Sequence, residues 1–141
     1  MLPEVYQMSK DCNAASLSRL KARVDALYLQ YIFPVLATIR VGEAPEALTY
    51  EARLQAAAAE AGVRLRRYIL PEDTAQQDLA VLIGQINDDP LLSSLLLLRP
   101  TPAQVDGGAL QGCILPEKAL EAVDWETLLE QVIDAAQRRA T

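Results

Sequence analysis

The stretch RVGEAPEALTYEARLQAAAAEAG, residues 40–62, carries the strongest signals for the fold of this chain. Its first two residues end the run VLATIRV, Val35–Val41. This run is mostly apolar with several β-branched residues, which is typical of a buried strand. Gly42 then predicts a turn, and residues 46–61 are rich in Ala, Leu and Glu, which favour a helix. Gly62 suits the end of that helix. A strand, a tight turn and a long helix are therefore expected in succession.

Further strand and helix signals follow this unit. VRLRRYIL, residues 63–70, alternates apolar and basic residues and predicts a strand near the edge of a sheet. Residues 75–87 repeat Leu and Ile at helical spacing and predict a helix, with Thr74 as its candidate N-cap. SSLLLL, residues 93–98, is a short continuous apolar run, which indicates a strand covered on both faces.

Both ends of the chain predict helices. Residues 13–31 have an amphipathic pattern, and Pro34 cannot continue a helix. From Trp125 onward apolar residues recur on one side, so residues 114–141 form a C-terminal tail and a helix that packs back on the sheet. Residues 1–141 are expected to form a single domain. The alternating order of elements predicts an α/β fold with three layers, α-β-α, and a mainly parallel sheet with right-handed crossovers.

Composition limits the classes of partner. The formal net charge is −6 and 51% of residues are hydrophobic, so a nucleic acid backbone would be repelled and no nucleic acid partner is expected. The sequence has neither a signal-peptide pattern nor a long uncharged apolar run, which predicts a cytoplasmic chain without a membrane partner. Cys12 and Cys113 lack zinc-site spacing, and Cys113 is expected to be a small buried apolar residue.

The absence of histidine limits the chemistry. Neither a Ser-His-Asp nor a Cys-His nucleophile system can be built, and the commonest metal ligand is missing, so no metal site is expected. Ligands of parallel sheets bind beyond the carboxyl ends of the strands, which here are Gly42 and residues 98–100. The nearby charges of Arg40, Arg99 and Asp106 are expected to be solvated in loops.

Residues 34–106 carry four landmarks in a fixed order. They are VGEAP at the end of a strand, Tyr50 in the next helix, AG followed by a strand and LPEDT, and INDDP. With them the chain resembles the N-terminal, folate-binding domain of bifunctional methylenetetrahydrofolate dehydrogenase/cyclohydrolase, and the similarity continues more weakly to Asp124. The resemblance implies the fold of that domain, one-carbon metabolism and a folate-like small molecule as ligand.

The catalytic positions depart from the family pattern. In the family, a tyrosine that lies against the folate is followed four residues later, on the same helix face, by a lysine that moves protons. Here Tyr50 is kept, but the lysine position is Leu54. The glutamine that hydrogen-bonds this lysine corresponds to Leu98, and a family serine corresponds to Ala47. Because losing a positioned acid or base costs about two to four powers of ten in rate, we assign no catalytic residue and expect little turnover.

The resemblance also implies a set of ligand-binding residues. Tyr50 is one, and Pro100 and Pro102 match the prolines that border the folate. Glu121 matches the aspartate that holds the pterin, with an extra methylene. The family's cofactor domain carries a Gly-rich phosphate loop, whereas this sequence has six glycines and no G-x-G-x-x-G, so no NAD(P) cofactor and no dehydrogenase activity are expected.

Three functional hypotheses remain open at the level of sequence. The first is a non-catalytic relative that binds a folate-like ligand or a protein partner through the old cleft, with micromolar or weaker affinity. The second is a residual methenyltetrahydrofolate cyclohydrolase that uses Glu121, Tyr50 or Asp106. The third is an assembly module whose apolar cleft, widened by Leu54 and Leu98, is covered by another subunit or a second copy.

Overall fold

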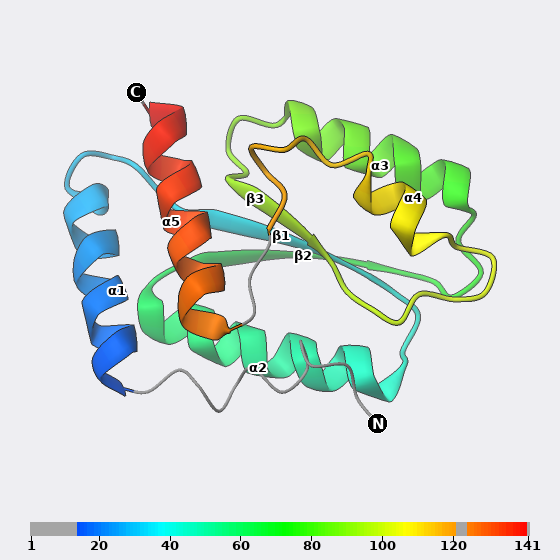
Figure 1. Cartoon of the computed structure of the whole chain (residues 1–141), viewed down its shortest axis with the longest axis horizontal. Helices are drawn as coiled ribbons and strands as arrows, with labels where there is room; N and C mark the ends of the chain where they lie inside the picture. The colour runs from blue at the N-terminus through cyan, green and yellow to red at the C-terminus, as the bar shows by residue number, and fades with distance from the viewer. Residues whose placement is uncertain (1–13, 121–123, 141) are drawn as a thin grey trace.

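The sheet at the centre of the molecule is parallel. The computed structural model describes residues 14–120 and 124–140. Within these ranges three strands form one sheet in the order β2-β1-β3 (Figure 1). They are β1 (Val35–Val41), β2 (Arg64–Leu70) and β3 (Ser94–Leu97). The basic and alternating strand β2 lies at an edge, as its pattern predicts, while the apolar β1 lies in the middle.

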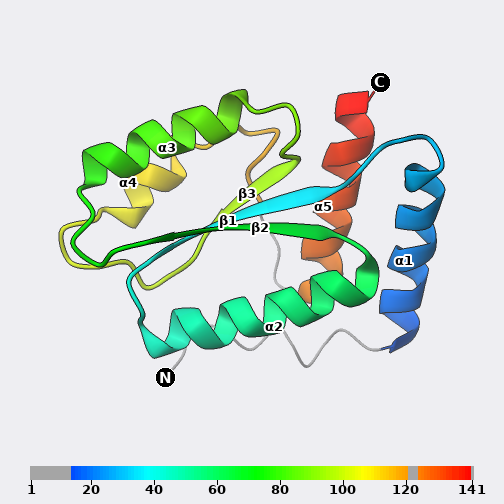
Figure 2. The same cartoon turned by 180° about the vertical axis from the view of Figure 1, so that it is seen from behind.

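Helices cover both faces of this sheet. The described helices are α1 (Ala14–Tyr28), α2 (Pro45–Ala61), α3 (Gln76–Asp88), α4 (Gly107–Gln111) and α5 (Trp125–Ala140). Figures 1 and 2 show α2 on one side of the strands, with α3 and α4 on the other side. The predicted three-layer α/β architecture with a parallel sheet is therefore confirmed.

Alternate residues of β1 supply two hydrophobic cores. Leu36 belongs to the core beneath α1, α2 and α5, whereas Ala37, Ile39 and Val41 belong to the core beneath α3 and α4. Successive side chains of a strand point to opposite faces of the sheet. Because both faces are covered, both sets of side chains must be mostly apolar, which explains the sequence VLATIRV.

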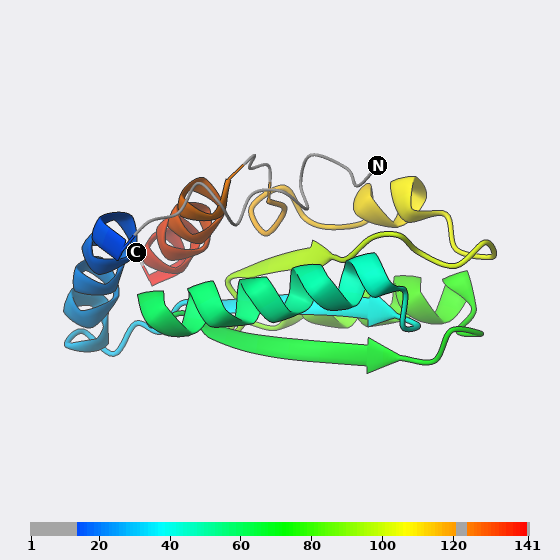
Figure 3. The same cartoon turned by 90° about the horizontal axis from the view of Figure 1, so that it is seen from below.

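The C-terminal helix packs back on the domain, as predicted. Helix α5 lies beside α1 (Figure 3), and its Leu129 and Ile133 are fully buried in the core that α1 and α2 share. At the surface of this helix pair, Nη2 of Arg23 lies 2.7 Å from Oδ1 of Asp134. The two helices therefore cover one part of the sheet together.

Some predicted element ends are wrong. Helix α1 ends at Tyr28 rather than at residue 31, because the chain reverses early and Tyr31 adopts a positive φ of 60°. Thr74 does not cap α3, because Ala75 holds the N-cap position and the Thr74 hydroxyl donates to the carbonyl of Pro71 at 2.6 Å. The short helix α4 was not expected from the sequence at all.

Candidate functional site

The carboxyl edge of the sheet carries a small pocket where the ends of β1 and β3 meet. This carboxyl-edge pocket has a volume of 290 Å³. Its lining residues are Val41, Gly42, Glu43, Ala44, Glu72, Pro100, Thr101 and Pro102. Gly42 adopts a φ of 82°, and a Cβ at this position would lie 3.3 Å from the Cβ of Glu72. The glycine therefore permits both the turn into α2 and the close approach of Glu72.

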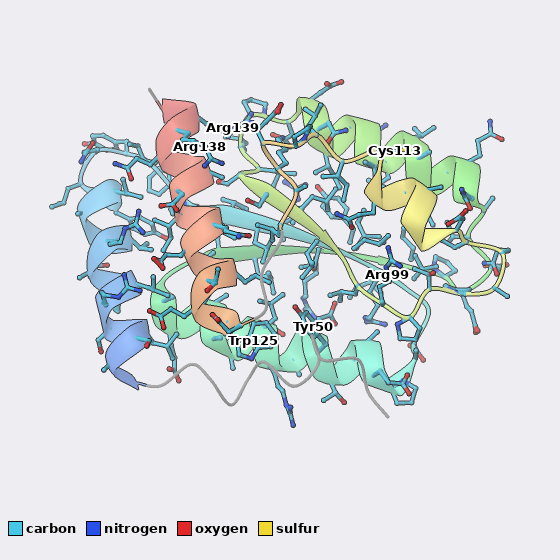
Figure 4. All side chains as sticks on the ribbon, viewed as in Figure 1. Tyr50, Arg99, Cys113, Trp125, Arg138 and Arg139 are labelled. Atoms are coloured by element: carbon cyan, nitrogen blue, oxygen red, sulfur yellow. The ribbon has the colours of Figure 1, made fainter. Side chains whose placement is uncertain are left out.

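Tyr50 lies in the hydrophobic core instead of in this pocket. Its residue exposure is 3%, and the described pocket lining does not include it. The ring of Trp125, the first residue of α5, lies against it with centroids 4.9 Å apart and an interplanar angle of 43° (Figure 4). Such a tilted aromatic contact is favourable, and it packs the indole directly against the Tyr50 ring.

The positions that the sequence resemblance aligns with polar groups of the family are part of the same core. Leu54 is fully buried, Leu98 is 3% exposed and Ala47 is 2% exposed, all within the cluster that contains Trp125. The backbone N–H of Leu98 donates to the carbonyl of Ile39 at 2.9 Å, which fixes its position at the end of the sheet. Leu54 and Leu98 offer only aliphatic groups, so neither can transfer a proton or orient a ligand by hydrogen bonding.

The predicted ligand-binding residues are therefore only partly brought together. Pro100 and Pro102 line the carboxyl-edge pocket, and Tyr50 is buried beside Trp125. Glu121 lies outside the described residues. The Trp125 contact could not be found from sequence spacing, because Trp125 and Tyr50 belong to helices far apart in the chain.

Arg40 is not a solvated loop charge, contrary to the expectation. It is 7% exposed, and its Nε lies 3.2 Å from Oε1 of Glu51 while its Nη1 donates to the carbonyl of Gly42 at 2.6 Å. Nη1 of Arg67 lies 3.6 Å from the same Glu51 oxygen. A charged residue inside an apolar strand requires such a partner, and this was the signal that the sequence offered.

Lys118 is a further buried charge that was not singled out from the sequence. Its Nζ donates to the carbonyls of Ile86 and Asp89 at 2.6 Å and 2.7 Å, at the end of α3. Each of these carbonyls also accepts a backbone N–H, so the ammonium adds a second hydrogen bond to each at the C-terminal end of the helix. Burial lowers the pKa of Lys118, and the charge of Arg139 lowers it further. The role of Lys118 here is to tie the segment after α4 to α3.

Cys113 and Asp106 occupy surface positions around α4. Cys113 is exposed, so the expectation of a buried cysteine is wrong; its backbone N–H bonds the carbonyl of Leu110 at the end of the short helix. Asp106 is exposed as expected, and its side chain caps α4 by accepting from the N–H of Ala109 at 3.1 Å. Arg99 is also exposed, with its guanidinium close to Gly107.

Residues 14–120 and 124–140 contain no cluster of three or more His, Cys, Asp or Glu side chains that could hold a metal ion. Over the same residues, every helix is too short or too polar to cross a lipid bilayer.

Sequence comparison places the chain in a known family. The model of the tetrahydrofolate dehydrogenase/cyclohydrolase catalytic domain matches residues 8–121. "Bifunctional protein FolD 3" of Rubrobacter xylanophilus is 36% identical over 105 residues, which are 74% of this chain and 33% of that protein. "Bifunctional protein FolD 2" of Frankia alni is 38% identical over 90 residues, covering 64% of this chain and 31% of that protein. The chain belongs to the tetrahydrofolate dehydrogenase/cyclohydrolase family.

Solved structures agree with this assignment. The bifunctional FolD methylenetetrahydrofolate dehydrogenase/cyclohydrolase of Campylobacter jejuni matches with a TM-score of 0.74 and 28% identity, over 79% of this chain and 39% of that protein. The FolD of Trypanosoma brucei, solved with NADP and an inhibitor, matches with a TM-score of 0.70 and 27% identity, over 84% of this chain and 39% of that protein. The chain spans about a third of the length of the curated relatives it matches.

Proposed function

We propose that this chain is a non-catalytic member of its family, which acts by binding and not by one-carbon chemistry. The observation that carries the proposal is the contact between Tyr50 and Trp125 above a core that contains Leu54 and Leu98. In this proposal the indole of Trp125 packs against Tyr50 in the place of a folate. The positions of the proton-transferring lysine and of its glutamine partner are aliphatic and buried.

The charge of the carboxyl-edge pocket supports the same conclusion. Glu43 and Glu72 both line it, and no basic side chain is among its lining residues. Two carboxylates in a small pocket repel an anionic ligand, and folates carry a carboxylate tail. Because the sequence also lacks a Gly-rich phosphate loop, the proposal assigns the chain no NAD(P) site.

A titration with tetrahydrofolate tests whether the inherited binding position is closed. We expect isothermal calorimetry to give micromolar or weaker binding to the wild-type chain, because Trp125 must leave Tyr50 before a pterin can take its place. The Trp125→Leu variant removes the indole and should bind more tightly than wild type if it keeps its circular dichroism spectrum. Submicromolar binding by the wild-type chain, or weaker binding by this variant, would contradict the proposal.

A further inference from the structure

A second pocket lies at the opposite, amino-terminal edge of the sheet. It has a volume of 530 Å³, within the range of about 300–1,000 Å³ that is usual for ligand sites. We call it the amino-edge pocket; its lining includes Val35 and Arg64, which are the first residues of β1 and β2, and Ser93, which precedes β3. The carboxyl-edge pocket, which Gly42 and Pro100 line, is therefore at the other end of the strands.

The wall of the amino-edge pocket is mainly apolar. Ile32 and Phe33 come from the segment between α1 and β1, and Leu91 and Leu92 come from the turn between α3 and β3. Leu91 is 72% exposed and Tyr31, which also lines the pocket, is 85% exposed. Large apolar side chains that gather around a hollow at the surface indicate a binding site more often than isolated exposed ones do.

Three arginines line the same pocket. They are Arg64 and Arg66 of β2 and Arg139 in the last turn of α5, and all three are exposed. Figure 4 labels Arg139 near the C-terminal end of α5. Among the residues that the structure describes, none of the three forms an ion pair with a carboxylate, whereas Arg23, for example, is paired with Asp134. The chain as a whole has a formal net charge of −6, so these three arginines make the pocket a region of locally positive charge.

The guanidinium of Arg64 is held in place by aromatic rings. Its Cζ lies 4.9 Å from the centroid of Phe33 and 5.9 Å from that of Tyr28, within the range of cation–π contacts. An arginine held by its planar face keeps its N–H groups available at the edge of the guanidinium. The charge of Arg139 also acts beyond the pocket: after burial, it is the second cause of the lowered pKa of Lys118.

We propose that the amino-edge pocket binds a small organic anion with an apolar body, such as an aliphatic or aromatic carboxylate. The apolar body packs against side chains such as Ile32, Phe33 and Leu92, and the anionic group pairs with Arg139 and Arg64. Charge-assisted hydrogen bonds between a guanidinium and a carboxylate are among the stronger polar contacts in proteins. This site is separate from the inherited folate position, so the inference does not depend on whether that position is closed.

Fluorescent probes with and without a charge test this inference. Anilinonaphthalene sulfonate is an apolar anion, and phenylnaphthylamine has nearly the same body without the sulfonate. We expect the anion to bind the wild-type chain more tightly than the neutral probe does, and octanoate to displace it. The Arg139→Gln variant should weaken binding of the anion by about tenfold, since it removes one charged hydrogen-bond donor.

Arg138→Gln is the matched control, because Arg138 neighbours Arg139 on α5 and lines a different pocket. It should leave the affinity for the anion unchanged. Arg64→Gln provides a second charge deletion on another element, and Leu91→Ser should weaken both probes because Leu91 is an exposed part of the wall. Equal affinity for the two probes, or equal effects of Arg138→Gln and Arg139→Gln, would overturn the proposal.

Discussion

At the scale of single residues, the buried charges of Arg40 and Lys118 stabilise contacts between elements of the fold. Arg40 is partnered by Glu51, and Lys118 by two backbone carbonyls. A buried charge without a partner costs several kcal/mol, so removing the partner of Arg40 or of Lys118 should destabilise the protein by roughly that amount. The sequence shows that these charges exist, but their partners depend on which elements pack together, and that is why Arg40 was misread as a loop residue.

Lys118 gives the stability of the protein a pH dependence of definite sign. Its pKa is lowered in the folded state, chiefly by burial, so between the folded and the unfolded pKa the unfolded chain binds more protons. The free energy of unfolding therefore gains its full contribution from this group above the ordinary pKa of 10.5. This contribution is lost as the pH falls through the lowered pKa of the folded state. The Lys118→Met variant lacks this gain. Its loss of stability relative to wild type should be larger at about pH 10 than at about pH 7 in urea titrations.

The control for this comparison is Lys21→Met. Lys21 is exposed on α1 and pairs with Asp25 one turn away, so its removal should change stability by less than about 0.5 kcal/mol at both pH values. If the difference between wild type and Lys118→Met is the same at both pH values, the assigned burial of the Lys118 ammonium is wrong.

At the scale of elements, local signals predict most of the fold. β1 and α2 were predicted to within one residue at each end, because an apolar β-branched run, a turn and the Gly62 end signal are all local. Helix α4 has two glycines in its first turn and no apolar periodicity long enough to detect. The end of α1 depends on how the chain reverses toward β1, and no local sequence pattern predicts this reversal.

Two glycines of the helices should respond oppositely to alanine. Gly62 ends α2 with a φ of 81°, and a Cβ there would lie 3.2 Å from Cγ1 of Val24, so Gly62→Ala should destabilise the protein by about 1–2 kcal/mol. Gly84 lies inside α3, and a Cβ there would meet nothing within 4 Å. Gly84→Ala should stabilise it by about 0.5–1 kcal/mol. Thermal unfolding measures both changes. Shifts of the midpoint temperature in the same direction would contradict the assigned positions of Gly62 at the end of α2 and Gly84 inside α3.

At the scale of the whole molecule, the sequence predicts little turnover but does not predict how the residues around Tyr50 pack. The leucines at positions 54 and 98 are visible in the sequence, and their aliphatic nature needs no coordinates. The contact of Trp125 with Tyr50 depends on how α5 returns across the domain, so only the three-dimensional structure reveals it. The amino-edge pocket likewise combines β2, the α3–β3 turn and the end of α5, which are far apart in sequence.

The most direct test of the non-catalytic account is the hydrolysis of methenyltetrahydrofolate, followed as loss of its absorbance in the presence and absence of the purified chain. A two-domain FolD under the same conditions serves as the positive control. The account predicts that the substrate disappears at the rate seen in buffer alone, because Leu54 and Leu98 can neither accept nor donate a proton. A rate clearly above that of buffer, which falls when Tyr50→Phe removes the remaining hydroxyl at the inherited site, would contradict it.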